Sequence, residues 1–149
     1  MKELFAATDL QEVLQRIDKL KPDTQRLWGK MDASQMLAHC NAAMEVAIGE
    51  KFPPQVFIGK LLGGLVKKSY LGEKPFPKNS PTDKSFIMTG KKDFQKEKEN
   101  LKQILTRFSE GGAAKCTTHR HSFFGKMTSE EWSILMYKHI DHHLRQFGV

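Results

Sequence analysis

Apolar residues recur at helical spacing along most of the chain, and this pattern predicts the secondary structure. In the first stretch, one helix face is formed at i, i+3, i+4, i+7 by Leu10, Val13, Leu14 and Ile17. Thr8 is the expected N-cap, and the helix should end before Pro22. Helical spacing also runs over residues 92–108, where Gly111-Gly112 should stop it.

Two further helices have capping-box start signals, in which an N-cap side chain and a Gln or Glu three residues later satisfy free backbone N–H groups. Asp32 with Gln35 predicts a helix up to Gly49, with one face formed by Met36, His39, Cys40, Ala43, Val46 and Ala47. Thr128 with Glu131 predicts the last helix, which carries Trp132, Leu135 and Met136.

The middle of the chain should be less regular. Residues 56–72, VFIGKLLGGLVKKSYLG, are apolar, but each glycine of the Gly63-Gly64 pair costs about 1 kcal/mol relative to alanine, so we expect a short or broken helix. Residues 72–90 contain three prolines and no periodicity, which indicates a long irregular segment. The two stretches together, residues 56–90, could be a lid over a pocket, core filling or a dimer contact. No alternating run predicts a strand, so the fold class is all-α.

Length and composition set broad limits. A chain of 149 residues predicts a single domain spanning 1–149. No apolar run approaches the roughly 20 residues of a bilayer-spanning helix, so no membrane partner is expected. The N-terminus lacks the apolar core of a signal peptide, and Cys40 and Cys116 have no CxxC spacing. These features favour a cytoplasmic protein.

The chain is basic, with 24 Lys and Arg residues against 17 acidic ones and a net charge of +7. The lysines over residues 91–102 are interleaved with Asp93, Glu97 and Glu99, as on a solvated helix face. No single-sign stripe or nucleic-acid-reading motif is visible. A basic nucleic-acid binder is therefore the last of the functional alternatives.

The stretch HIDHHLRQF, residues 139–147, places imidazoles where the last helix should face the core. At about 100° per residue, His143 and Gln146 lie within about 40° of His139 on the apolar stripe, and His142 lies on its flank. Unpaired buried nitrogens cost about 1–3 kcal/mol each, and a metal ion would satisfy a pair one turn apart. The pair His139 and His143 is therefore a candidate pair of metal ligands, although for the pair alone two hydrogen-bonded core histidines are the favoured interpretation.

A third ligand must come from another helix that faces the same core. His39 is the candidate, because it lies on the apolar face of its predicted helix. By spacing alone, a metal site and a set of hydrogen-bonded core histidines remain equally open. Cys40 is expected to be core, His119 and His121 to form hydrogen bonds in a loop, and His142 to lie beside the site or at the surface.

The C-terminal segment HSFFGKMTSEEWSILMYKHIDHHLRQFGV resembles the signature of the DinB/YfiT-like family, whose members are described as metal-dependent enzymes. In that family, a His-Pro-x-Phe-Gly-x-Leu-Thr motif leads into a helix with His-x-x-x-His followed by Gln. WGKMDASQMLAHCNAAMEVAIG, residues 28–49, resembles the family's helix with the first histidine. The whole chain resembles a small branch labelled only as a domain of unknown function, and the resemblance is weak over residues 49–91.

The resemblance implies a four-helix bundle, often dimeric, with a divalent ion held by three histidines near one end. The ligands fall on His39, His139 and His143, and Gln146 falls on the glutamine that follows them. His121 falls on the histidine of the motif before the last helix, where Ser122 replaces the common proline. The expected fold is thus a DinB-like four-helix bundle with a long irregular segment between the middle helices.

Three neutral imidazoles leave coordination positions open, as in reactive metal sites. The expected cofactor is a divalent ion, with Zn or Ni favoured. The family resemblance implies a metal-dependent hydrolase or a small-thiol-dependent transferase, with a small-molecule substrate, a cellular thiol and a homodimer as expected partners. The alternative is a metal-binding or stress-related protein without turnover.

Overall fold

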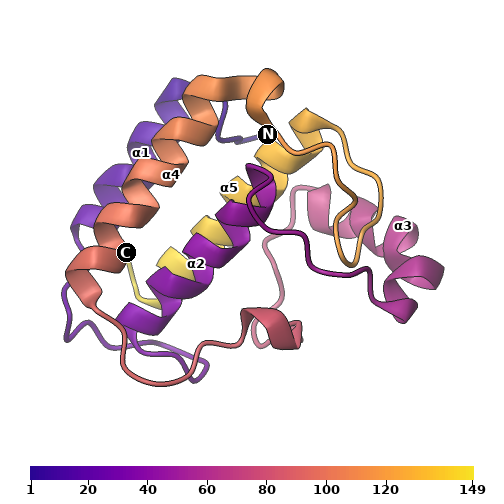
Figure 1. Cartoon of the computed structure of the whole chain (residues 1–149). Coiled ribbons are helices and arrows are strands. Elements are labelled where there is room, and N and C mark those ends of the chain that lie inside the picture. Colours follow the sequence, from indigo (N-terminus) through magenta and orange to yellow (C-terminus); the bar gives the residue numbers. More distant parts are fainter.

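A computed structural model describes residues 1–149 and contains five α-helices and no strand, which confirms the predicted all-α class (Figure 1). The helices are α1 (Ala7–Asp18), α2 (Ala33–Ala47), α3 (Phe57–Leu71), α4 (Phe94–Lys115) and α5 (Ser129–Gln146). A single 3₁₀ turn, η1 (Lys84–Phe86), interrupts the irregular segment 72–90. No helix combines the length and the apolar character that crossing a bilayer requires.

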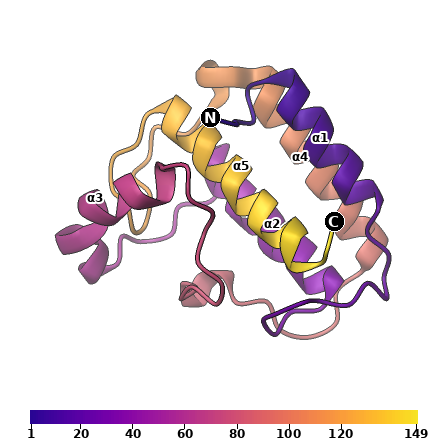
Figure 2. The same ribbon diagram turned by 180° about the vertical axis from the view of Figure 1, so that it is seen from behind.

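The core lies among α1, α2, α4 and α5. The helices α1 and α2 do not contact one another, but each packs against both α4 and α5. The buried positions include those that the apolar spacing predicted in α1, namely Leu10, Val13 and Ile17. In Figures 1 and 2, α2 and α5 run side by side, and α3 lies outside the group formed by the other four helices. Among the helices, α3 contacts α5 alone.

Both predicted capping boxes are present. The Asp32 side chain accepts a hydrogen bond from the Gln35 backbone N–H, and the Thr128 side chain accepts one from the Glu131 backbone N–H. In each box, the N3 side chain also bonds the N-cap backbone N–H. Because α2 and α5 begin at fixed residues, the angular positions of all side chains along them are fixed as well.

The prediction that Thr8 caps the first helix is wrong. The N-cap is Ala6, which makes no side-chain capping bond, and Thr8 lies in the first turn. The preceding segment is held by other contacts, because Asp9 accepts a hydrogen bond from the Glu3 backbone N–H and Ser133 accepts one from the Phe5 N–H, both at 2.9 Å. These contacts tie the N-terminus to α1 and α5 and set where the helix begins.

The prediction of a short or broken helix over 56–72 is also wrong, because α3 is continuous over 15 residues. Its glycines allow a close approach to the connection between α4 and α5. A Cβ atom at Gly59 would lie 2.6 Å from the Phe123 carbonyl oxygen, and one at Gly63 would lie 2.1 Å from the same atom. Packing against Phe123 thus outweighs the poor helix propensity of glycine.

Replacing Gly63 with alanine should destabilise the protein by about 1–3 kcal/mol, because the added methyl group meets backbone that cannot move aside. The neighbouring Gly64 is the matched control, since a Cβ there meets nothing within 4 Å. Gly64→Ala should stabilise by about 0.5–1 kcal/mol through helix propensity alone. Urea denaturation of both variants measures the difference, and equal free energies of unfolding would contradict the packing role of Gly63.

The glycine pair predicted to end the fourth helix does interrupt it, but the helix does not stop there. Gly112 adopts a non-helical conformation (φ 52°, ψ −151°), so the regular helix is interrupted at the expected glycine pair. A further helical turn then continues to Lys115. The positive φ explains why glycine stands at this position.

Candidate metal centre

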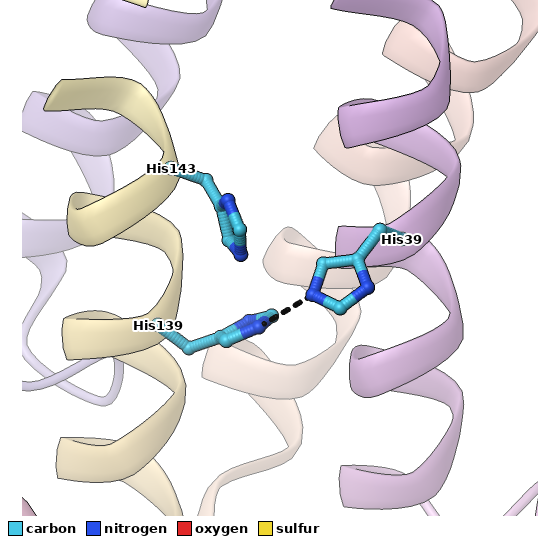
Figure 3. Close-up of side chains that lie close together, drawn as sticks. All are labelled: His39, His139 and His143. Atoms are coloured by element: carbon cyan, nitrogen blue, oxygen red, sulfur yellow. Dashed lines mark hydrogen bonds between the residues drawn. The ribbon is translucent and has the colours of Figure 1, made fainter. Parts of the chain in front are cut away.

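The facing sides of α2 and α5 bring together His39, His139 and His143 (Figure 3). One ring nitrogen from each histidine lies within 4.8 Å of those of the other two. The ring centroids are 4.7 Å apart for His39 and His143, and 5.0 Å apart for His39 and His139. His39 and His143 are buried and His139 is partly buried, so three nitrogen donors converge in a largely dry space that could hold a metal ion.

The orientation of His39 is fixed by a backbone carbonyl. Its Nδ1 lies 2.9 Å from the carbonyl oxygen of Phe86 in η1, and since a carbonyl only accepts, Nδ1 must carry the proton. A neutral ring then has a lone pair on Nε2, which points toward α5. A histidine that donates one N–H to a carbonyl and presents the other nitrogen is the usual form of a metal ligand.

His143 is oriented in the same way by a side chain. Its Nδ1 lies 2.9 Å from Oε1 of Gln146, and the Nε2 amide group of Gln146 donates to the Trp28 carbonyl oxygen at 2.8 Å. The second bond fixes which end of the amide faces His143, so Nδ1 donates and Nε2 is left with a free lone pair. Gln146 therefore connects the histidine to the loop before α2.

His139 completes the group and is the least satisfied of the three. Its Nε2 lies 3.0 Å from the Nε2 of His39, and its Nδ1 is buried without a hydrogen-bond partner. Because His39 Nε2 carries no proton in the neutral ring, this contact is made either by an N–H group of His139 or by a cation that binds both nitrogens. The donor set therefore fits a divalent ion, which would accept both lone pairs at once.

The electrostatic surroundings keep the three imidazoles neutral. Burial lowers the pKa of His39, and burial together with the neighbouring histidines lowers the pKa of His139 well below its usual value. Burial, followed by the charge of His39, lowers the pKa of His143 to about 3. Neutral rings at physiological pH are the form that binds metal ions.

The other predicted site residues lie around this group rather than in it. The His142 ring packs 5.1 Å from His143 and 5.8 Å from Trp28. His121 Nδ1 accepts hydrogen bonds from the backbone N–H groups of Phe123 and Phe124 at 3.0 and 3.2 Å, so this nitrogen serves the turn before α5. Burial lowers the pKa of His121 to about 4.

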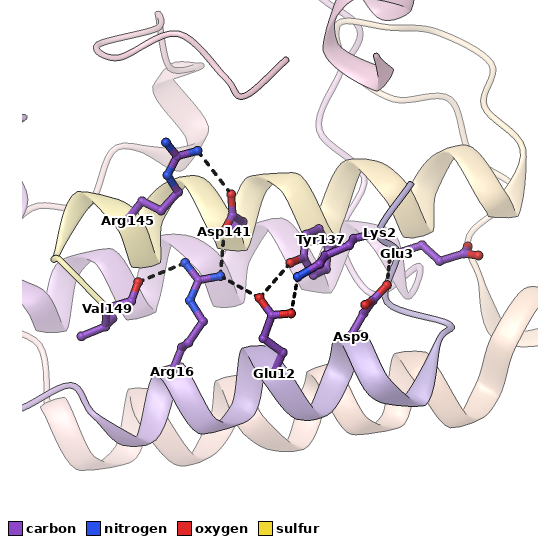
Figure 4. Close-up of polar contacts among 9 residues, drawn as sticks. All are labelled: Lys2, Glu3, Asp9, Glu12, Arg16, Tyr137, Asp141, Arg145 and Val149. Carbon is purple, nitrogen blue, oxygen red and sulfur yellow. Dashed lines mark hydrogen bonds and ion pairs between the residues drawn. The ribbon is translucent and has the colours of Figure 1, made fainter. Parts of the chain in front are cut away.

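Cys40 and His119, which were expected to lie outside the site, do so, and Asp141 lies outside it as well. Cys40 is fully buried in the core, and burial raises the pKa of its thiol far above the usual range. His119 is exposed and packs against Phe52 with ring centroids 4.1 Å apart. Asp141 points to the opposite side of α5, where it pairs with Arg16 at 2.7 Å (Figure 4).

Two backbone contacts of the site were missed at the sequence level: the Phe86 carbonyl oxygen accepts from His39, and the Trp28 carbonyl oxygen accepts from Gln146. Every residue has a carbonyl group, so no residue type marks one that will meet a site side chain. The aromatic rings of the segment 72–90 gave a partial signal. Phe86 lies 6.3 Å from His39 and Phe76 lies 6.0 Å from His142, measured between ring centroids, so this segment does reach the histidines.

Replacing Gln146 with leucine should lower the affinity for a divalent ion by about 10–100-fold, because His143 loses the acceptor that fixes its tautomer and ring orientation. Arg145→Leu is the matched control, because the Arg145 side chain follows directly before Gln146 but is exposed and pairs with Asp141. Competition with a chromophoric chelator measures both affinities. Equal affinities in the two variants would show that Gln146 does not support the site.

Comparison with known proteins identifies the family but no activity. Residues 1–148 match the family described as "Protein of unknown function (DUF1569)". No curated protein and no solved structure matches the chain. The match covers both histidine-bearing helices, so the convergent imidazoles lie within the shared domain. The chain therefore belongs to the DUF1569 family of proteins of unknown function.

Proposed function

We propose that the protein is a metalloenzyme that holds one divalent ion, Zn or Ni, through His39, His139 and His143. The observation that carries the proposal is the convergence of their ring nitrogens, with two of the rings oriented by hydrogen bonds through Nδ1. Because Nδ1 of both His39 and His143 is engaged, each ring keeps a lone pair on Nε2, and a neutral His139 has only one N–H to offer these two lone pairs.

The proposed activity is hydrolysis of a small molecule or transfer of a small cellular thiol to one. When bound by three imidazoles, a divalent ion retains open positions at which it lowers the pKa of a water molecule or a thiol. The chain's own part is to hold three neutral ligands in place and to limit access of bulk water. His142 is the better candidate to accept a proton, because its ring packs against His143 whereas His121 Nδ1 is engaged by backbone N–H groups.

The proposed architecture is that of a DinB-like four-helix bundle. The mutual packing of α1, α2, α4 and α5 around the core supports this proposal, with α3 and the segment 72–90 inserted between α2 and α4. We further propose that residues 1–149 are one domain, that the protein acts in the cytoplasm, and that it forms a homodimer. Gel filtration with light scattering tests the last point.

Turnover assays separate the enzyme from a metal-binding protein without activity. Panels of esters and lactams, supplied with Zn²⁺, Ni²⁺ or Mn²⁺ and with or without small thiols, should reveal a substrate that the wild type converts. The variant His139→Ala should lose that conversion, whereas His119→Ala should retain it. Metal binding without turnover on any panel would favour the metal-binding or stress-related alternative.

A further inference from the structure

The outward face of α3 is an unusually apolar surface. Five large apolar side chains on this one helix are between 47% and 76% exposed: Phe57, Ile58, Leu61, Leu62 and Leu65. Monomeric proteins seldom leave such a contiguous group in water, and those that do generally use it to bind something.

These five residues form one continuous face. At about 100° per residue they span an arc of about 140° around the helix axis. Gly59 and Gly63, which touch Phe123, lie on the other side of the helix. The helix is thus anchored through its glycines and leaves its large side chains exposed, and the helix itself lies outside the group formed by the other four (Figure 2).

The net positive charge of the protein comes from α3 and from a segment that lies beside it. Residues 51–72 contain four lysines and no acidic residue, and residues 111–129 contain three basic residues and no acidic residue. Together they carry seven of the 24 Lys and Arg residues and none of the 17 acidic ones, so the rest of the chain has 17 of each sign. The whole net charge of +7 therefore comes from these two segments.

The two basic segments are neighbours in space. The Val56 backbone N–H donates to the Ser122 carbonyl oxygen at 2.9 Å, and Lys67 donates to the Lys126 carbonyl oxygen at 3.1 Å. Lys67 also pairs with Glu131 at 2.8 Å, whereas Lys60 and Lys68 are exposed and have no acidic partner. By the same helical spacing, Lys60 lies about 60° beyond one edge of the apolar arc and Lys68 about 20° inside that edge.

We propose that this surface, the outward face of α3 with its flanking lysines, docks on an anionic lipid surface. An interfacial helix buries apolar side chains at the boundary between headgroups and acyl chains while lysines reach the anionic headgroups. A second copy of the chain fits less well, because two α3 helices packed face to face would bring lysines together with no acidic residue on either helix to pair with them.

The proposal revises the expectation that the protein has no membrane partner. That expectation rested on the lack of a bilayer-spanning segment, and no helix of the structure could span a membrane. A helix that lies in the interface needs only one apolar face and adjacent positive charge. The 15 residues of α3 meet that lesser requirement.

Vesicle co-sedimentation of the 149-residue chain tests the proposal. The wild type should bind vesicles with about 30 mol% phosphatidylglycerol and release them at high salt, and it should bind pure phosphatidylcholine at least about tenfold more weakly. Leu61→Gln and Leu65→Gln should each weaken binding about tenfold. Lys60→Gln and Lys68→Gln should each weaken it about fivefold.

Matched controls lie elsewhere on the surface. Leu27→Gln replaces a leucine that is 69% exposed outside α3, and Lys19→Gln and Lys91→Gln remove exposed charges from other parts of the chain. These three should bind vesicles within about twofold of the wild type. Circular dichroism confirms that each variant is folded.

Three results would overturn the proposal. The first is no binding of the wild type to anionic vesicles, and the second is equal weakening by the α3 variants and by the controls. The third is that the wild type is a dimer, that Leu65→Gln converts it to a monomer, and that neither protein binds vesicles. That result would assign this surface to a second copy of the chain. Binding that follows the α3 substitutions and salt supports the docking surface.

Discussion

Replacing His143 with alanine should lower the affinity for Zn²⁺ or Ni²⁺ by about 100-fold or more. Structural zinc sites in zinc-finger peptides have apparent binding free energies of about 10–16 kcal/mol at neutral pH, and loss of one of a few ligands removes several kcal/mol of such a total. His143 is buried and its tautomer is fixed by Gln146, so no nearby side chain can replace its Nε2 without rearrangement. Isothermal titration calorimetry, or competition with a chelator, measures the change.

His119→Ala is the control for nonspecific binding through imidazole. His119 is exposed and lies against Phe52, so its removal should leave the affinity unchanged. If His143→Ala retained the wild-type affinity, the assignment of the ligands would be wrong. If both variants lost affinity equally, the metal would be bound through scattered surface histidines instead.

Replacing Phe108 with alanine should destabilise the protein by about 3–5 kcal/mol, the largest stability effect that we expect of a single substitution. Phe108 is completely buried and packs against Phe5 with ring centroids 5.0 Å apart. Phe57→Ala is the matched control, because that ring is 76% exposed on α3 and should change the free energy of unfolding by less than about 0.5 kcal/mol. Urea denaturation followed by circular dichroism compares the two.

The same measurement shows whether the fold rests on the apolar core or on the metal. With a core of 24 buried residues, the chelated protein should remain helical and lose only the stabilisation that metal binding adds, about 2.7 kcal/mol when free metal is at 100 times its dissociation constant. Loss of helicity on chelation would contradict this expectation and make the site structural.

The sequence predicted best those features that depend on local chemistry. The capping boxes at Asp32 and Thr128 involve residues three apart, and both are present in the structure. Because these caps fix the start of α2 and α5, the helical period placed His39, His139 and His143 on apolar helix faces, and the structure shows that these faces meet. Spacing therefore indicated the candidate residues, and the packing of the two helices brings them together.

The features that the sequence did not predict depend on contacts between distant segments. From local preference alone, Gly63 is predicted to break a helix, but in the structure it allows close contact with Phe123. Thr8 is likewise predicted to be an N-cap, but hydrogen bonds to the backbone of Glu3 and Phe5 place the start of the helix elsewhere. In each case a tertiary contact outweighs a local preference of about 1 kcal/mol.

The location of the segment 72–90 was open at the sequence level for the same reason. Its contact with the site is the hydrogen bond between the Phe86 carbonyl oxygen and His39, which involves a backbone group that no sequence pattern marks. The role of the large apolar side chains of α3 was also left open, because helical spacing shows that they share a face but not whether another element covers that face.

The most direct test of the central claim is the metal content and ligand environment of the protein purified without a histidine tag. We predict one divalent ion per chain in the wild type and in His119→Ala, and nearly none in His39→Ala or His139→Ala. X-ray absorption of the wild type should show imidazole nitrogens at about 2.0–2.1 Å from a zinc ion. Metal retained at wild-type stoichiometry by His139→Ala, or a ligand shell without imidazole, would contradict the account.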